Sequence, residues 1–428
     1  MNMFSARSLV LSFAMTMGLA SIAVQAQDRV RGVDCTEERE SPSGTLTERT
    51  YNRLSNAYED IGEELYDEAY EALENLLERT RRQDYEQAVI RQAMGHVRMQ
   101  QERPLEAIEH FERAVELDQM RNEQHFEMVL LIANLYYSEE MYAEALDQLD
   151  FWFCLVDEDQ SNLVDVWVMK ASIHAQADEF REALDAIDRA LALADDPREQ
   201  WYQLKLGMHM ELNEYREAID VLKIVIPMSP DSKNYWIQLS SLHMELDNEE
   251  DSKAALKLAY RRGLLDRQTE FVQLASLLQS KGAPRRAAEV MQDGLEQGIV
   301  EDTRRHWEMA AGAWYEAREQ DSALDAYERA GAQADDGKID LQRSFILTDL
   351  ERWEEARDAL TRALELGGLE PNERGNAHLL LGMSYFNLGN YDASIEQFDQ
   401  ARQFDRVRQA ASEWINHVRE ERGRRSSR

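Results

Sequence analysis

The residue types that most often carry catalysis or bind metals are present in this chain, but they lack the spacing that either task needs. A zinc protease would show two histidines four residues apart with a glutamate after the first, and none of the nine histidines forms such a pair. Two cysteines, Cys35 and Cys154, are too few for a structural zinc site made of four cysteines. We therefore expect neither a metal nor another cofactor.

Two short segments resemble reactive motifs without completing them. Residues 331–338 (GAQADDGK) approach a phosphate-binding loop, but five residues separate the glycines where four are required, and Ile339 replaces the Ser or Thr of the motif. We interpret this segment as a turn between two repeats. Gly382-Met383-Ser384 lacks the Gly-x-Ser-x-Gly order of a nucleophile elbow. The many regularly spaced carboxylates indicate a solvated acidic face, so the sequence predicts a protein that is not an enzyme.

The composition narrows the class of partner. The chain has 428 residues, with 83 Asp and Glu against 48 Lys and Arg, which gives a net charge of −35. Binding nucleic acid requires a basic face that neutralises phosphates, and wide contact with anionic lipid requires the same. Both are therefore disfavoured, and a basic protein partner is favoured. Hydrophobic residues make up 43% of the chain, which is enough for a folded protein.

The first 26 residues have the pattern of a secretory signal peptide. Arg7 gives a short positive start, residues 9–24 are uncharged and mostly apolar, and Val24-Gln25-Ala26 fits a cleavage site. An uncleaved anchor is the alternative, but the apolar run is short for a bilayer span of about 20 residues. We expect a periplasmic protein, secreted through this cleavable peptide, with no membrane span after cleavage.

Small residues recur in pairs along the rest of the chain. The two members of a pair are twelve residues apart, except in one pair where they are eleven apart, and successive pairs follow at intervals of 33 to 38 residues. Such a period indicates a repeat architecture. The pairs are Ala57/Ala69, Gly95/Ala107, Ala133/Ala145, Ala171/Ala183, Gly207/Ala218, Ser240/Ser252, Ala275/Ala287, Ala311/Ala323, Ser344/Ala356 and Gly382/Ser394.

Each repeat reads as two helices. A bulky residue follows the second small residue by four positions, as Phe111 and Phe398 do, and a further small residue usually follows by seven. Spacings of four and seven place side chains on one face of a helix. Small residues on that face let two helices approach closely, and the bulky residues fill the groove between them.

These residues resemble the tetratricopeptide repeat, most clearly over residues 377–405 (AHLLLGMSYFNLGNYDASIEQFDQARQFD). The resemblance implies an all-α, right-handed superhelical solenoid of about ten helix-turn-helix repeats over residues 47–405. Units one, five and nine depart from the pattern. Residues 27–46 form an N-terminal lead, and residues 406–419 predict a capping helix that buries Ala411, Trp414, Ile415 and Val418. Residues 420–428 form a basic tail that we expect to be disordered.

Several phrases carry a closer resemblance. Residues 235–265 (YWIQLSSLHMELDNEEDSKAALKLAYRRGLL), together with LLLGMSYFNLGNYDAS and FWFCLVDE, look like the periplasmic tetratricopeptide proteins associated with TonB–ExbB–ExbD systems. This resemblance implies a protein–protein interaction scaffold in a TonB-type energy-transduction or iron-uptake transport system. Its partners would be envelope proteins, with TonB, ExbB and ExbD as candidates. A scaffold for outer-membrane assembly or polysaccharide export is the alternative.

Cys35 and Cys154 predict a disulfide, because an oxidising compartment is expected. The bond would pin the N-terminal lead onto the second helix of the third repeat. The alternative is that Cys154, beside Phe151-Trp152-Phe153, is a small core residue and that Cys35 is free.

The first helix of each repeat lines the inner surface of this repeat family, and alignment on its small residue predicts the side chains of a groove for an extended peptide or protein tail. They mix uncharged polar groups, which can pair with a bound backbone, with aromatic groups, which bury area. The alternative is that they are ordinary inner-face positions without a ligand. No array of Lys and Asn that would clamp a C-terminal carboxylate is present. The predicted groove residues are Asn134, Tyr137, Ser172, Ser241, Met244, Ser276, Gln279, Tyr315, Phe386 and Asn387.

The end of the chain, residues 419–428 (REERGRRSSR), reverses the acidic sign of the body. Two interpretations stay open. The arginines could contact anionic lipid, peptidoglycan or an acidic partner, or they could form a solubilising end that complements the preceding helix terminus.

Overall fold

The computed structural model describes residues 29–30, 33–35, 38–157 and 160–426. The predicted signal peptide, residues 1–26, lies outside the described residues. The chain divides into two compact units, residues 1–221 and 222–428, and the boundary falls within one helix.

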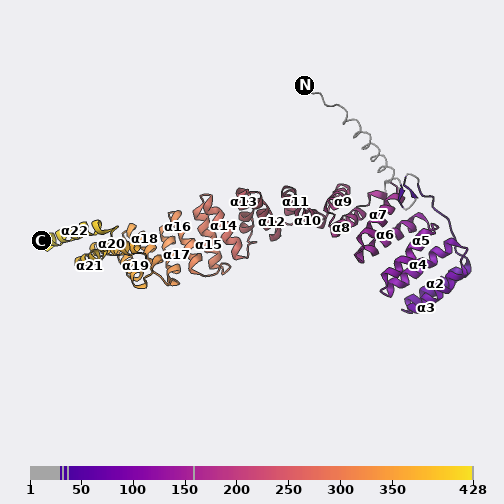
Figure 1. Ribbon diagram of the computed structural model, residues 1–428, viewed down its shortest axis with the longest axis horizontal. Helices are drawn as coiled ribbons and strands as arrows, with labels where there is room; N and C mark the ends of the chain where they lie inside the picture. Colours follow the sequence, from indigo (N-terminus) through magenta and orange to yellow (C-terminus); the bar gives the residue numbers. More distant parts are fainter. Residues whose placement is uncertain (1–28, 31–32, 36–37, 158–159, 427–428) are drawn as a thin grey trace, which may run out of the picture. The chain divides into compact units, whose positions relative to one another are not determined.

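The first unit begins with two short antiparallel strands, in which Arg29 pairs with Asp34 and Val30 with Val33. Helices follow, joined by short turns (Figure 1). The elements are β1 (Arg29–Val30), β2 (Val33–Asp34), α2 (Glu48–Gly62), α3 (Tyr66–Arg79), α4 (Asp84–Gln100), α5 (Pro104–Glu116), α6 (Asn122–Ser138), α7 (Tyr142–Leu155), the 3-10 helix η1 (Gln160–Asn162), α8 (Val164–Gln176), α9 (Phe180–Leu193), α10 (Glu199–Glu211) and α11 (Tyr215–Met228), which crosses into the second unit.

The second unit is helical throughout its described residues. After α11 its helices are α12 (Lys233–Glu245), α13 (Glu249–Arg261), α14 (Gln268–Ser280), α15 (Pro284–Glu296), α16 (Arg304–Glu316), α17 (Gln320–Ala332), α18 (Lys338–Asp349), α19 (Trp353–Leu366), α20 (Pro371–Asn387), α21 (Tyr391–Ala401) and α22 (Arg408–Ser426). The all-α prediction is confirmed. Residues 333–337 lie between α17 and α18, so the segment that resembles a phosphate loop is a turn between repeats, as predicted.

Helices pack in consecutive pairs, and small residues lie where the two helices of a pair meet. Ser240 and Ser252 join α12 to α13 through a hydrogen bond of 2.8 Å between their hydroxyls. In the last pair, the Ser394 hydroxyl donates to the carbonyl oxygen of Gly382 at 2.8 Å. The predicted helix pairing is therefore confirmed, and the small residues are what brings the backbones close enough for these bonds.

The size of the bulky residue is matched to the small residue that faces it. A Cβ added at Gly382 would lie 2.7 Å from the Phe398 ring, and one added at Gly95 would clash with the Phe111 ring. Both phenylalanines are fully buried. The two repeats that carry phenylalanine at this position thus carry glycine opposite, because the ring occupies the space of a Cβ.

The turn inside each pair uses a left-handed residue. Gly389 has a φ of 77° between α20 and α21, and Gly282 has a φ of 72° between α14 and α15. In the other eight pairs the residue is not glycine, for example Glu102 with a φ of 57° and Asp247 with a φ of 55°. A non-glycine residue in this conformation costs about 1–2 kcal/mol, so packing of the helices fixes these turns.

The N-terminal lead is attached to the first three repeats in two places. Cys35 forms a disulfide with Cys154 of α7, which confirms the predicted bond. Residues 38–47, which we call the strap, then contact the starts of α6 and α4. Arg39, with 8% of its side chain exposed, donates to the Met120 carbonyl at 2.9 Å and pairs with Asp118. At the other end, buried Glu86 accepts from the Thr47 backbone N–H at 2.7 Å.

The last helix closes the opposite end. Val407 precedes α22 and Ala411, Ile415 and Val418 lie within it, and all four are buried against α21. Trp414 stacks on Phe398 with ring centroids 5.6 Å apart. The helix continues to Ser426, so the prediction of disorder is wrong for residues 420–426. An ion pair between Arg422 and Asp392 of α21 extends the docking past the apolar part.

Replacing Gly382 with Ala should destabilise the α20–α21 pair by about 1–3 kcal/mol, because the new methyl overlaps the Phe398 ring. Hydrogen exchange of α20 and α21 measures this as faster local opening. A second substitution, Phe398→Leu, should recover part of the loss. Gly312→Ala is the matched control, because nothing lies within 4 Å of that Cβ position, and it should stabilise α16 by about 0.5–1 kcal/mol. Equal effects of the two glycine substitutions would contradict the size matching.

Opening the disulfide should loosen the first three repeats only. The bond closes a loop with a sequence separation of 119, and the chain-entropy model gives about 5 kcal/mol for such a loop as an upper figure. A reductant should speed hydrogen exchange in α2 to α4 and leave α16 to α21 unchanged. The variant Cys35→Ser should reproduce this pattern without reductant and show no further response to it. Unchanged exchange in α2 to α4 would show that the strap does not depend on the bond.

Candidate functional site

The predicted groove residues lie on first helices, as expected, but they are divided between the two units. Three lie in the first unit on α6 and α8, and seven lie in the second unit on α12, α14, α16 and α20. The two sets are therefore considered separately. Asn134, Ser241, Ser276, Tyr315 and Asn387 are exposed, and the other five are half-buried.

Three of the polar groove residues already donate a hydrogen bond to a backbone carbonyl of their own helix. The Ser172 hydroxyl donates to the Val168 carbonyl at 2.9 Å, and the Ser276 hydroxyl donates to the Val272 carbonyl at 2.8 Å. The Asn387 amide donates to the Met383 carbonyl at 2.9 Å. The two hydroxyls therefore offer oxygen acceptors to a ligand, and the Asn387 amide offers its oxygen and its second N–H.

Phe386 is not an open groove residue. Its ring centroid lies 5.6 Å from that of Trp414 and 5.3 Å from that of His417, both on α22. The capping helix covers this position, which the repeat pattern alone could not indicate. The structure therefore assigns Phe386 to the cluster that docks α22.

Sequence reasoning missed two exposed aromatic residues on the same side of the first helices. Tyr58 of α2 is 47% exposed, and Phe345 of α18 is 41% exposed. Each directly follows the small residue of its helix, Ala57 or Ser344. Asn134, Ser172, Ser241 and Ser276 were predicted from this same position. Applying the rule to all ten repeats would therefore have predicted Tyr58 and Phe345 as well.

The exposed side of the first helices is nearly free of charge. We define the inner stripe as the residues three and two positions before, and one and four positions after, the small residue of each first helix. These positions fall within one arc of the helix surface. Of the forty positions, only Lys205, Glu211 and Glu308 are charged, although charged residues make up 31% of the chain. Burial does not account for this, because only Leu54, Ala93, Met208 and Leu341 are buried.

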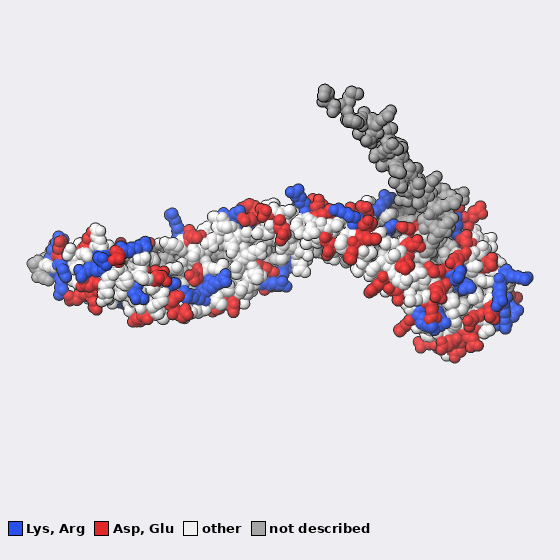
Figure 2. Space-filling model, viewed as in Figure 1, with Lys and Arg blue, Asp and Glu red and all other residues white. Residues whose placement is uncertain are grey.

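The acidic excess is unevenly shared. Residues 1–221 contain 46 acidic and 20 basic residues, whereas residues 222–428 contain 37 acidic and 28 basic residues. On the face drawn in Figure 2, acidic atoms are spread over α2 to α7, and a mostly uncharged area lies over α14 and α15. The second unit therefore carries the smaller excess of negative charge.

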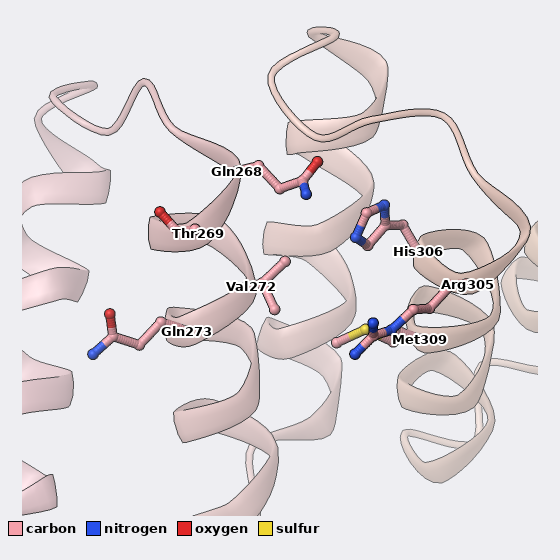
Figure 3. Close-up of a pocket in the computed structure, with 7 residues that line it drawn as sticks. All are labelled: Gln268, Thr269, Val272, Gln273, Arg305, His306 and Met309. Carbon is pink, nitrogen blue, oxygen red and sulfur yellow. The ribbon is translucent and has the colours of Figure 1, made fainter.

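A pocket of about 310 Å³ opens on the inner stripe of the second unit (Figure 3). It lies between α14 and α16, and Figure 3 shows Gln268 and Val272 of α14 extending toward the α16 side chains. Val272 and Gln273 of α14 and Met309 of α16 are stripe residues. The lining residues are Gln268, Thr269, Val272, Gln273, Arg305, His306 and Met309.

The polar groups of this pocket suit recognition of a backbone or a carboxylate. Nδ1 of His306 lies 2.8 Å from the Glu301 carbonyl oxygen, which makes Nδ1 the donor and leaves Nε2 as an acceptor in the neutral ring. Arg305 is exposed and has no ion pair within the part of the chain that the structure describes. Val272 and Met309 supply apolar contact between these polar groups.

Among the described residues, no three His, Cys, Asp or Glu side chains gather in a way that could hold a metal ion. None of the helices in the described part of the chain combines the length and the hydropathy needed to cross a membrane.

Comparison with known proteins identifies the repeat. The tetratricopeptide repeat family model matches residues 93–150 and 347–411, one segment in each unit. A search of curated proteins finds no match.

Three solved structures illustrate the similarity. A tetratricopeptide repeat protein from Parabacteroides merdae is 14% identical, with a TM-score of 0.33, over 59% of this chain and 94% of that chain. MamA from Desulfovibrio magneticus RS-1 is 17% identical, with a TM-score of 0.31, over 40% of this chain and 93% of that chain. A chain of the APC/C hetero-tetramer Cut9–Hcn1 is 14% identical, with a TM-score of 0.27, over 86% of this chain and 83% of that chain.

Proposed function

Because the chain is a tetratricopeptide repeat protein, we propose that it is a non-enzymatic scaffold that holds an extended segment of another protein along the inner stripe. Proteins built from these repeats are generally scaffolds for protein partners. Their stacked helices present long surfaces on which many weak contacts add up.

The observation that carries the proposal is the near absence of charge from the inner stripe. A side chain at the edge of a binding surface can keep its charge hydrated, whereas a charge at the centre of an interface loses water and needs a matched partner. Uncharged amides, hydroxyls, methionines and aromatic rings avoid that cost. Methionine also adapts its shape to different ligands, and Met244 and Met309 lie on this surface in the second unit.

The location that we propose is the periplasm. A cleavable signal peptide is predicted over residues 1–26, and the Cys35–Cys154 disulfide suits an oxidising compartment. The resemblance of residues 235–265 to TonB-associated repeat proteins supports a role in a TonB-type transport system. The expected partners are envelope proteins, and the candidates are TonB, ExbB and ExbD.

Crosslinking in cells tests the surface and the partner together. A photocrosslinking amino acid placed at Tyr137, Tyr315 or Phe345 should capture an envelope protein, because all three positions belong to the inner stripe, where Tyr315 and Phe345 are exposed and Tyr137 is half-buried. Mass spectrometry of the adducts then identifies the partner. The matched controls are Glu182 of α9 and Asp325 of α17, which are exposed on second helices and should give no such adduct.

Each outcome of this experiment decides something. Adducts to TonB, ExbB or ExbD support the transport role, and adducts to assembly or export proteins replace it with the alternative scaffold. Adducts from the control positions but not from the inner stripe would refute the proposed surface.

A further inference from the structure

A second recess lies on the other side of the second unit, away from the inner stripe. It is a groove of about 290 Å³ between α13 and α15, the second helices of two consecutive repeats, and α14 forms its floor. Leu274 and Leu278 leave α14 on the side opposite to Val272 and Ser276, since residues four apart share one helical face and residues two apart point to roughly opposite sides. The lining residues are Lys257, Tyr260, Arg261, Leu274, Leu278, Arg286, Glu289 and Val290.

Three cations line this groove without a partner. Lys257, Arg261 and Arg286 make no hydrogen bond or ion pair with any residue that the structure describes. Their neighbours on the same helices and turns are paired. Those pairs are Lys253 with Glu250, Arg262 with Asp231, Lys281 with Glu249, and Arg285 with Glu289.

The acids at the groove are already engaged, which explains why the cations are left over. Glu289 pairs with Arg285 at 3.2 Å. Asp293 accepts a hydrogen bond of 2.9 Å from the Tyr260 hydroxyl. Burial, followed by this hydrogen bond, raises the pKa of Tyr260 to about 12, so the phenol keeps its proton and remains the donor. The chain has 83 acidic and 48 basic residues. Because acids are in such excess, three cations without an acidic partner in one groove are unexpected.

The three cations would attract an anionic group, and the floor of the groove indicates what kind of molecule carries that group. Leu274, Leu278 and Val290 are apolar and only 0–3% exposed, so the floor offers a small apolar contact at Leu278 and Val290, from which a hydrated inorganic anion gains nothing. A peptide with an apolar side chain flanked by carboxylates would match both the apolar floor and the three cations. The two guanidinium groups can each bind a carboxylate through two parallel hydrogen bonds.

We propose that this groove binds an acidic segment of a partner protein, with carboxylates on Lys257, Arg261 and Arg286 and one apolar side chain against Leu278 and Val290. The site is separate from the inner stripe, so the protein holds two partner segments on two faces. The inner stripe recognises an uncharged extended segment, and the basic groove recognises an acidic one.

A peptide titration with the full mature protein tests the proposal. The probe is a fluorescein-labelled peptide, Glu-Asp-Leu-Glu-Asp-Leu-Glu, followed by fluorescence anisotropy. The triple variant Lys257→Glu, Arg261→Glu, Arg286→Glu should weaken binding about 30-fold or more, since charge-assisted contacts are lost and repulsion replaces them. Replacing both leucines of the peptide by serine should weaken binding about tenfold.

The matched control reverses three exposed cations of the same unit that lie outside the groove, Arg318, Arg374 and Arg406. It makes the same change in net charge and should alter the peptide affinity less than about threefold, because long-range effects are screened at physiological salt. Circular dichroism and thermal unfolding check that both triple variants are folded. Inner-stripe crosslinks should persist in both, so failure here and failure of the proposed scaffold function remain distinguishable.

Four results would overturn the proposal. They are equal loss in the two triple variants, no effect of replacing the leucines, absence of peptide binding by the wild-type protein, and groove-dependent binding of phosphatidylglycerol vesicles or inorganic phosphate in place of the peptide. Concentration-dependent self-association that the groove variant abolishes would identify the acidic segment as part of a second copy of this chain.

Discussion

The close contact between small residues where two helices of a pair meet is the constraint on which the rest of this structure depends. It is tightest where Phe111 faces Gly95 and Phe398 faces Gly382, because the ring occupies the space of a Cβ. Since every pair is built in this way, every first helix uses the same side for its partner. The side that remains is the inner stripe, so the packing rule of the core also fixes which side chains a ligand can reach.

Charge follows from the same repetition. Several cations bridge one repeat to the next at nearly the period of the array, as in Arg181 with Glu214, Arg352 with Asp321, and Lys281 with Glu249. Exposed ion pairs contribute about 0–1 kcal/mol each, so they align neighbouring repeats more than they hold them together. Two surfaces differ from this pattern of paired charges, and both are the proposed binding surfaces. The inner stripe lacks charge where the chain is rich in it, and the groove between α13 and α15 keeps cations that no neighbouring acid neutralises.

The period of the small residues was enough to predict the helix pairs, because that spacing reports directly on a contact inside each repeat. The period could not predict features that depend on contacts between a repeat and other parts of the chain. Phe386 has the sequence position of a groove residue, but α22 covers it. The tail was predicted to be disordered from its composition, whereas Arg422 finds an acid on α21. The sequence did not predict the basic groove, because its cations, Lys257, Arg261 and Arg286, come from two repeats and occupy unrelated positions in them.

The two terminal segments of the chain are attached to the array in different ways. The end pair of a solenoid has a face that no further repeat covers. At the C-terminal end, α22 covers it by burying Ala411, Ile415 and Val418 against α21, and hydrophobic burial alone can hold such a helix. The strap of residues 38–47 has only Leu46 as a large apolar side chain, so burial contributes little. Hydrogen bonds from Arg39 and to Glu86 position the strap, and the disulfide supplies the attachment that a hydrophobic face would otherwise provide. The disulfide joins the N-terminal lead to the third repeat, so a change that breaks it is expected to act at that end of the array and not at the end that α22 covers.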